Sequence, residues 1–483
     1  MGEAALNQET DLSPSAPTSP RKAWSLGRLY SELLAWLRQD LFRRTESGPI
    51  GWRKIALAVA AVAVGAAISL SRTVGPGSLN TIWIEDARFL LDQALNNSFT
   101  TALAAPISSY YQEPARLITA VAVLFPLSWV PGIMAVCAAL QYCMYGLVAY
   151  IASGPHLRSP WLRLLMVAPI CALPLAYTQA NNDLVTVQFF GLYGAFWTVL
   201  WLPGTRAGKI FSPLVMATVS WTAVLSIVFA PLILARLLVD RSKNAWAVAI
   251  VWATGVLLEL SETIRGQSHH DQFGYNGPFF VVRNFVTRVV PRALFGERSL
   301  GGPGVDYRGE YTQLHVTNGT AHDVLIFGAW LVVLAVVALA AIRFTDPHWT
   351  LAIVAAVFSL GIFTDELLIN TSVVQARYVI APALLLYTAL VALLRPKKIE
   401  NTRTNGAAVL SSAVFRWLPA AGLAVLLLVA ITLNFRVTNG RTTSPPWTSV
   451  VAEATRACAQ PGVAAYTFAH EWWYMTIPCS RVR

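Results

Sequence analysis

Two adjacent carboxylates, Glu85 and Asp86, follow the first long apolar run of the chain, in the segment WIEDARFLLDQALNN (83–97). A carboxylate at a membrane edge can take a proton from a hydroxyl group as that group attacks a substrate. On an α-helix Glu85, Arg88 and Asp92 share one stripe and can pair, or simply form a solvated ion-pair face. Asp86 is turned about 100° away. We therefore expect Asp86 to be the better free base, with Glu85 as the alternate.

A second polar group lies at the end of a later apolar run, in TDELLINTSVVQARY (364–378). It contains Asp365, Glu366, Arg377 and Tyr378. Arg377 stands where the chain re-enters the membrane, a costly place for a charge unless it meets an anion or a headgroup. Its guanidinium can clamp a phosphate through two parallel hydrogen bonds. Snorkelling toward the headgroups is the alternative interpretation.

Other polar stretches are weaker candidates. His269 and His270 are adjacent and point in different directions, which makes a poor metal site by itself. The C-terminal tail contains Trp447, His470, Glu471, Trp472 and Trp473. This composition suits sugar stacking or the aromatic belt of a membrane protein. Cys458 and Cys479 lie in the same tail, and a disulfide between them is a candidate if the tail lies outside the cytoplasm.

The composition indicates a membrane environment. Of the 483 residues, 55% are hydrophobic and 13% are charged, and the mean hydropathy is +0.53. Several apolar runs reach about 18 residues, the length that spans a bilayer as a helix. The net charge of +11 comes from Lys and Arg clusters at the ends of apolar runs, which contact membrane lipids rather than nucleic acid. No Walker A loop, dinucleotide fingerprint, nucleophile elbow or paired-cysteine zinc pattern is present.

The sequence therefore predicts an all-α, polytopic transmembrane bundle of about 10 to 12 spans. Its candidate spans are residues 55–71, 116–152, 162–179, 184–202, 210–235, 245–261, 322–342, 349–363, 378–394 and 416–433. Prolines at 126, 131 and 231 leave open whether two of the runs, 116–152 and 210–235, are single helices or broken pairs. Residues 83–97 are expected to form a short amphipathic helix in the first outer loop.

The basic loop 395–416 is placed in the cytoplasm by its excess of Lys and Arg. This places the C-terminus outside the cytoplasm, and the basic residues Arg53 and Lys54 before the first span predict a cytoplasmic N-terminus. The sequence thus predicts a multi-pass protein of the inner (plasma) membrane, with the topology of residues 116–235 left open. The predicted organisation is a disordered cytoplasmic tail (1–23), an interfacial amphipathic helix (24–50), a transmembrane domain (51–436) with outer loops 73–115 and 262–321, and an extracytoplasmic tail (437–483).

This organisation resembles the GT-C superfamily of membrane glycosyltransferases, in which an acidic pair opens the first outer segment. Three blocks, WIEDARFLLDQA, SSYYQEPARLITAVAVLFP and NNDLVTVQFFGLYGAFWTVLW, resemble poorly characterised actinobacterial membrane proteins of this type. The resemblance covers roughly residues 83–202, with the step at Arg377 and Tyr378. Such proteins often have Gly after the acidic pair, where this chain has Ala87.

The resemblance implies inverting transfer of a sugar from a polyprenyl-phosphate donor to an envelope glycan or glycolipid acceptor. Asp86, or Glu85, would be the general base, and Arg377 with Arg116 and Tyr378 would bind the donor phosphate. The substrate-binding candidates are Tyr110, Tyr111, Asn181, Asn182, Asp365, Glu366, His269 and His270. A divalent cation, Mg or Mn, is left open.

Two other functions remain open on the sequence alone. A transporter or lipid flippase also needs many helices, but it is expected to place ionisable residues along a path through the bilayer, and the candidate spans contain few. A noncatalytic scaffold for envelope enzymes is the other alternative, in which the acidic pair is a solvated turn.

Overall fold

The computed structural model describes residues 26–45, 48–107, 110–175, 180–265, 277–300, 320–369, 374–397, 406–436, 439–470 and 473–482. Seven helices in these ranges are long and apolar enough to cross a membrane. They are α2 (Trp52–Leu70), α6 (Val130–Ala152), α12 (Lys243–Arg265), α15 (Thr320–Ala341), α16 (Trp349–Ile369), α17 (Ile380–Leu393) and α18 (Gly406–Leu433). Three shorter apolar stretches, 160–171, 187–200 and 224–239, add to them. The predicted polytopic helical fold is confirmed.

The other helices are α1 (Leu26–Trp36), α3 (Asp92–Asn96), α4 (Phe99–Leu103), α5 (Glu113–Ala122), α7 (Gly154–Leu157), α8 (Pro160–Val167), α9 (Val187–Leu200), α10 (Arg206–Ser220), α11 (Ala230–Val239), α13 (Gly277–Asn284), α14 (Val290–Phe295), α19 (Gly440–Thr443) and α20 (Trp447–Cys458). A two-stranded antiparallel sheet, β1 (Ala465–His470) with β2 (Trp473–Pro478), completes the described elements. The sequence did not predict this sheet.

The core is built from helices that are apolar on every side. Every residue of α9 and α17 is buried, and α17 packs against α9 and α16. By contrast, α2, α15 and the described part of α18 bury only a minority of their apolar residues. A helix that is hydrophobic all round must face protein or lipid on every side. The buried helices therefore form the centre, and the exposed apolar helices form a surface suited to lipid.

The two ambiguous apolar runs are broken in the structure. The first divides at Phe125 and Pro126 into α5 and α6, and the second divides after Ser220 into α10 and α11. Pro131 and Pro231 lie in the first turns of α6 and α11. Proline is tolerated there because its missing N–H would have had no partner in the helix. The alternative with broken pairs is therefore correct.

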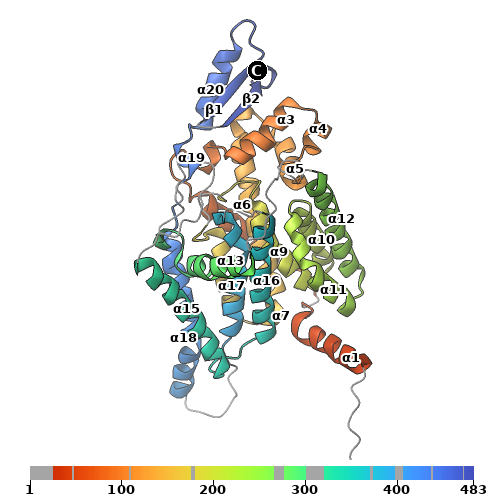
Figure 1. Cartoon of the computed structure of the whole chain (residues 1–483), viewed down its shortest axis with the longest axis vertical. Helices are drawn as coiled ribbons and strands as arrows, with labels where there is room; N and C mark the ends of the chain where they lie inside the picture. The colour runs from red at the N-terminus through yellow and green to blue at the C-terminus, as the bar shows by residue number, and fades with distance from the viewer. Residues whose placement is uncertain are drawn as a thin grey trace, which may run out of the picture.

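One end of the bundle, called here the Glu85 end, gathers α3, α4, α5, α19, α20 and the small sheet (Figure 1). The sheet docks on α3, because Asp92 Oδ1 accepts a hydrogen bond from the Thr476 N–H at 2.6 Å. A disulfide joins Cys458 and Cys479, with Cα atoms 5.3 Å apart. The tail thus covers the segment that carries the acidic pair.

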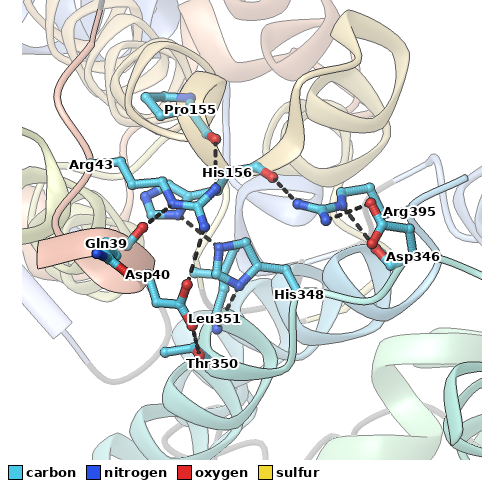
Figure 2. Close-up of polar contacts among 10 residues, drawn as sticks. All are labelled: Gln39, Asp40, Arg43, Pro155, His156, Asp346, His348, Thr350, Leu351 and Arg395. Carbon is cyan, nitrogen blue, oxygen red and sulfur yellow. Dashed lines mark hydrogen bonds and ion pairs between the residues drawn. The ribbon is translucent and has the colours of Figure 1, made fainter. Parts of the chain in front are cut away.

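The opposite end, called the His156 end, contains α1, α7 and the start of α16 (Figure 1). There the rings of His156 and His348 approach to 3.4 Å between Nδ1 and Nε2 (Figure 2). Arg43 and Arg395 flank this pair. Within the predicted interfacial helix, residues 26–41 are helical. The predicted disordered tail (1–23) lies outside the described residues.

Candidate functional site

The acidic pair lies where the backbone changes from an α-helical to a π-helical turn. A π-helical segment runs from Asp86 to Leu91 and continues into α3. Its i→i+5 bonding winds more residues into each turn than an α-helix does, so α-helical stripes do not apply. Glu85 forms its ion pair with Arg377, outside this helix, and Arg88 is exposed beside the Phe89 ring. Asp92 accepts a hydrogen bond from the small sheet. The predicted pairing of Glu85, Arg88 and Asp92 is therefore wrong.

Glu85 forms an ion pair with Arg377, with 2.7 Å between Oε1 and Nη1. The two side chains are 23% and 17% exposed. The Arg377 guanidinium carbon lies 5.7 Å from the ring centre of Phe189 and 6.0 Å from that of Tyr378. The chain folds Arg377 to this position through a short 3-10 turn, Ala376–Val379, that opens α17. The anion that Arg377 meets in the structure is thus the first member of the acidic pair.

The second Glu85 oxygen, Oε2, is shielded from water and has no hydrogen-bond partner among the described residues. A buried carboxylate oxygen without a partner carries a desolvation cost of about 1–3 kcal/mol. Such an atom is suited to accept a hydrogen bond from a bound ligand. Glu85 therefore has one oxygen engaged by Arg377 and one available to a hydroxyl group.

Tyr110 and Glu366 complete the surroundings of this pair. The Tyr110 side chain hydrogen-bonds Gln188, and the charges of Arg377, Glu85 and Glu366 all reach it. Burial raises the pKa of Tyr110, so its hydroxyl stays protonated and able to donate. Glu366 is 2% exposed. The structure thus brings together five predicted site residues: Glu85, Tyr110, Glu366, Arg377 and Tyr378.

Asp86 points the other way, into the protein, and is 0% exposed. Its Oδ2 accepts from the Leu184 N–H at 3.1 Å and its Oδ1 from the Val185 N–H at 3.2 Å. The expectation that Asp86 is the free carboxylate is therefore wrong. A neighbouring Asp183, 1% exposed, lies against Asp86, and its carboxyl can hydrogen-bond Asp86 when one of the two is protonated.

Two buried carboxyls can hydrogen-bond only when they share a proton. Burial raises the pKa of Asp183 well above its usual value, and the charge of Asp86 raises it further. Burial also raises the pKa of Asp86. At a pH where the two carboxyls share one proton, the pair carries a single negative charge. Asp86 and Asp183 thus act as one structural unit.

Arg441, 1% exposed, supplies the balancing positive charge. Its Nη1 donates to the backbone carbonyls of Asn181 at 3.0 Å and Asn182 at 2.8 Å, and its Nη2 donates to that of Thr81 at 3.3 Å. Burial lowers the pKa of Arg441, while the two carboxylates oppose this shift. The tail residue Arg441 therefore clamps the turn that holds the acid pair.

The Asn181 and Asn182 amides also serve this turn. Asn181 Nδ2 donates to Thr73 Oγ1 at 2.7 Å. Asn182 has a left-handed backbone, with φ of 56°, and its amide exchanges hydrogen bonds with Ser69 and Ser78. Asparagine tolerates this conformation better than most residues do. Both predicted substrate-binding amides are therefore directed at the protein itself.

Arg116 and Tyr111 belong to a separate group of contacts. Arg116 donates to the backbone oxygens of Tyr111 and Ala102 and to Gln93 Oε1. Burial lowers the pKa of Arg116 to about 10. The Tyr111 N–H donates to Glu259 and its hydroxyl donates to Glu262. The structure thus does not join Arg116 to Arg377 in one phosphate clamp.

The remaining predictions concern Asp365, His269, His270 and the metal ion. Asp365 is adjacent to Glu366 on α16 and has one buried oxygen without a partner among the described residues. His269 and His270 lie outside the described residues. Across the described ranges, no group of three or more His, Cys, Asp or Glu side chains is placed to hold a metal ion. The Mg or Mn ion stays a prediction.

Four residues near the site escaped the sequence analysis as site candidates: Asp183, Gln188, Phe189 and Arg441. Asp183 directly follows the two asparagines, so its position in a polar turn was a usable signal. Arg441 lies more than 350 residues after Asp86 in a polar tail, where nothing local distinguishes it from a solvated arginine. Gln188 and Phe189 are part of an apolar helix and gave no signal.

The fold and site define a multi-span helical membrane protein with a carboxylate–guanidinium site at one end of its helices. No family model and no curated protein matches the chain. The chain is similar to the cryo-EM structure of arabinofuranosyltransferase AftD from Mycobacteria, with 15% identity and a TM-score of 0.37 over 80% of this chain and 28% of that one. It is also similar to the archaeal oligosaccharyltransferase AglB from Archaeoglobus fulgidus, in complex with an inhibitory peptide and a dolichol-phosphate.

The match to AglB has 11% identity and a TM-score of 0.38, over 85% of this chain and 59% of that one. The chain thus spans less than two thirds of the length of either structure. Both structures are of glycosyl-transferring enzymes, the class that the sequence resemblance named. At these TM-scores the similarity carries no argument about chemistry, so the function below rests on the site.

Proposed function

We propose that this protein is a membrane glycosyltransferase that moves a sugar from a polyprenyl-phosphate donor to a hydroxyl group of an envelope glycan or glycolipid, on the outer face of the membrane. The observation that carries the proposal is the Glu85–Arg377 pair. It offers a carboxylate with one unengaged oxygen, held 2.7 Å from a cation suited to phosphate. Proton removal and stabilisation of a leaving phosphate are the two tasks of such a transfer.

In the proposed reaction the donor phosphate displaces Glu85 as the ion-pair partner of Arg377. A guanidinium can bind phosphoryl oxygens through two parallel hydrogen bonds, so this exchange releases the carboxylate. Glu85 then accepts the proton of the acceptor hydroxyl. The hydroxyl oxygen forms a bond to the anomeric carbon, whose bond to the phosphate oxygen breaks with inversion. The bonding electron pair leaves on the polyprenyl phosphate, and Arg377 stabilises its charge.

Three aromatic side chains lie beside the ion pair and can contact the sugar and the phosphate of the donor. The protonated Tyr110 hydroxyl can donate to a sugar or phosphate oxygen, and the Phe189 and Tyr378 rings line the guanidinium. Asp86 contributes by holding the Glu85 backbone in place rather than by contacting substrate. A divalent cation, Mg or Mn, would add a positive charge for the phosphate if the reaction requires one.

The test is transfer of radiolabelled sugar from a panel of polyprenyl-phosphate sugars to an envelope extract, using the purified full chain. We expect Glu85→Gln to lower the transfer rate by about 10²-fold or more while the protein stays folded. Asp86→Asn should act mainly on thermal stability. Glu262→Gln is the matched control, because Glu262 binds Tyr111 in a separate group and should keep its parental rate.

Full activity of Glu85→Gln would contradict the proposed base. Failure of the folded parent protein to bind or turn over any donor would contradict the glycosyltransferase itself. That second result would favour a transporter, flippase or scaffold.

A further inference from the structure

A row of arginines lies on the bent helical segment formed by α13, a π-helical turn (Phe285–Val289) and α14. Arg292 in α14 is 0% exposed. All three of its guanidinium nitrogens lack a hydrogen-bond partner among the described residues. A buried cation without hydrogen bonds costs several kcal/mol, so protein folds rarely leave one in this state. Arg292 is therefore placed to bind something that is not part of the described chain.

Two further donors point to the same place. Arg288 has a buried Nε without a partner, and both ring nitrogens of His322 lack one in the described ranges, although His322 is only 5% exposed. Arg292 is a near charge for both residues. Burial, together with the positive charges of Arg292 and Arg283, lowers the pKa of Arg288 to about 10. Like charges are thus held close together, and the nitrogens named here make no hydrogen bond within the described chain.

The π-helical turn explains how the arginines share one face. Arg283 and Arg288 lie five residues apart across the junction of α13 with the wider π-helical turn, and Arg288 and Arg292 lie four apart, the spacing of neighbours on one face of a helix. Arg283 is exposed, Arg288 is half-buried and Arg292 is fully buried. Burial therefore increases along the row, from a surface arginine to one in the interior.

The charges of the group leave room for one negative charge. Two carboxylates have charges that reach it: Glu297 near Arg292, and Asp323 near His322. Against three arginines they leave a formal excess of one positive charge. A singly ionised lipid phosphate carries one negative charge and several acceptor oxygens, so it matches both the charge and the donors.

We propose that Arg288, Arg292 and His322 form a binding site for a phosphate group, and that a membrane lipid supplies this group. The lipid source follows from the surroundings. On α13, Phe279 is 78% exposed and Val282 is 49% exposed. The neighbouring helices α15 and α18, which pack on α14, also bury only a minority of their described apolar residues. A lipid tail can therefore lie beside a buried cationic site.

This site is separate from the Glu85–Arg377 pair. The backbone oxygen of Ala293, next to Arg292, accepts a hydrogen bond from the Tyr387 hydroxyl. Tyr387 follows Arg377 by ten residues, which is roughly 15 Å along α17. Figure 1 shows α13 running crosswise to the long helices, away from the segment that carries the acidic pair. The inference therefore does not depend on the proposed glycosyltransferase.

The test measures lipid binding to the full chain in detergent by native mass spectrometry and thermal unfolding. The probes are dioleoyl phosphatidic acid, dioleoylglycerol with the same tails, and inorganic phosphate. We expect phosphatidic acid to bind and raise the unfolding temperature, with binding at least about tenfold weaker in Arg292→Gln and about threefold weaker in Arg288→Gln. Arg265→Gln removes an exposed charge from α12 and should bind as the parent does.

Without lipid, Arg292→Gln should stay folded and unfold near the parental temperature, because the substitution removes no hydrogen bond from the described chain. Equal binding of phosphatidic acid and dioleoylglycerol would overturn the proposal, as would unchanged binding in the folded Arg292 and Arg288 variants. Binding of inorganic phosphate as tight as that of phosphatidic acid, and equally sensitive to Arg292→Gln, would overturn the lipid source.

Discussion

Both ends of the helical bundle contain an arginine that holds a carboxylate at 2.7 Å: Arg395 with Asp346 at the His156 end and Arg377 with Glu85 at the Glu85 end. Arg395 also donates to the backbone oxygens of Asp346 and His156, as Figure 2 shows. Asp346 is 42% exposed, so water can reach its remaining oxygen. Arg377 instead lies among aromatic rings, and its partner Glu85 has a buried oxygen without a described partner.

The difference distinguishes a structural ion-pair cluster, called here a joint, from an ion pair that can bind a ligand. An ion pair whose members also bind backbone groups ties segments together, and a ligand has little to gain by entering it. A pair that leaves a buried acceptor unsatisfied is less stable than it can become with a ligand bound. The Glu85 end therefore contains both kinds of cluster: the exchangeable Glu85–Arg377 pair and, beside it, the Asp86–Asp183–Arg441 joint.

The largest expected effect comes from breaking that joint. Arg441→Met should lower the free energy of unfolding by about 3–5 kcal/mol, because it leaves the Asp86–Asp183 charge and three backbone carbonyls without their partner. Thermal unfolding of the purified chain measures this. Arg456→Met is the control, since Arg456 is exposed on α20. Equal stability of the parent and Arg441→Met would show that Arg441 is not a clamp.

The next prediction compares the two ion pairs directly. Arg377→Lys should lower the sugar-transfer rate by about 10²-fold, equivalent to about 2.7 kcal/mol, because lysine keeps the charge but loses the two parallel hydrogen bonds to phosphate. Arg395→Lys makes the same change at the same distance from a carboxylate and should leave the rate within about twofold. Comparable losses in both variants would remove the distinction between site and joint.

Much of this architecture was predictable from the sequence, because long apolar runs with basic ends are a strong physical signal. The sequence also placed Glu85 and Arg377 at helix boundaries where charges need partners. It misassigned Asp86, because a single π-helical turn redirects its side chain into the core. It missed Arg441, because a contact between the tail and residues 181 and 182 has no local pattern that precedes the fold.

A smaller effect, up to about 1.4 kcal/mol per pH unit for each group, distinguishes the two ends by the sign of their pH dependence. Burial, together with the charges of Arg43 and Arg395, lowers the pKa of His348 to about 4, while Asp40 opposes this shift. The unfolded chain then binds more protons than the folded one between pH 6.5 and 4. Stability at the His156 end should therefore fall as the pH falls through this range, and His348→Asn should flatten that slope.

The Asp183 carboxyl should contribute the opposite slope. Its pKa is raised by burial and by the charges of Asp86 and Glu85, with Arg441 opposing. The folded chain then binds more protons than the unfolded one above pH 3.8, so this contribution to stability decreases as the pH rises through the raised pKa. Asp183→Asn keeps a hydrogen-bond donor for Asp86 and should remove this slope without breaking the joint. A variant that steepens the decrease, or that unfolds as readily as Arg441→Met, would mean that Asp183 is ionised and paired rather than sharing a proton.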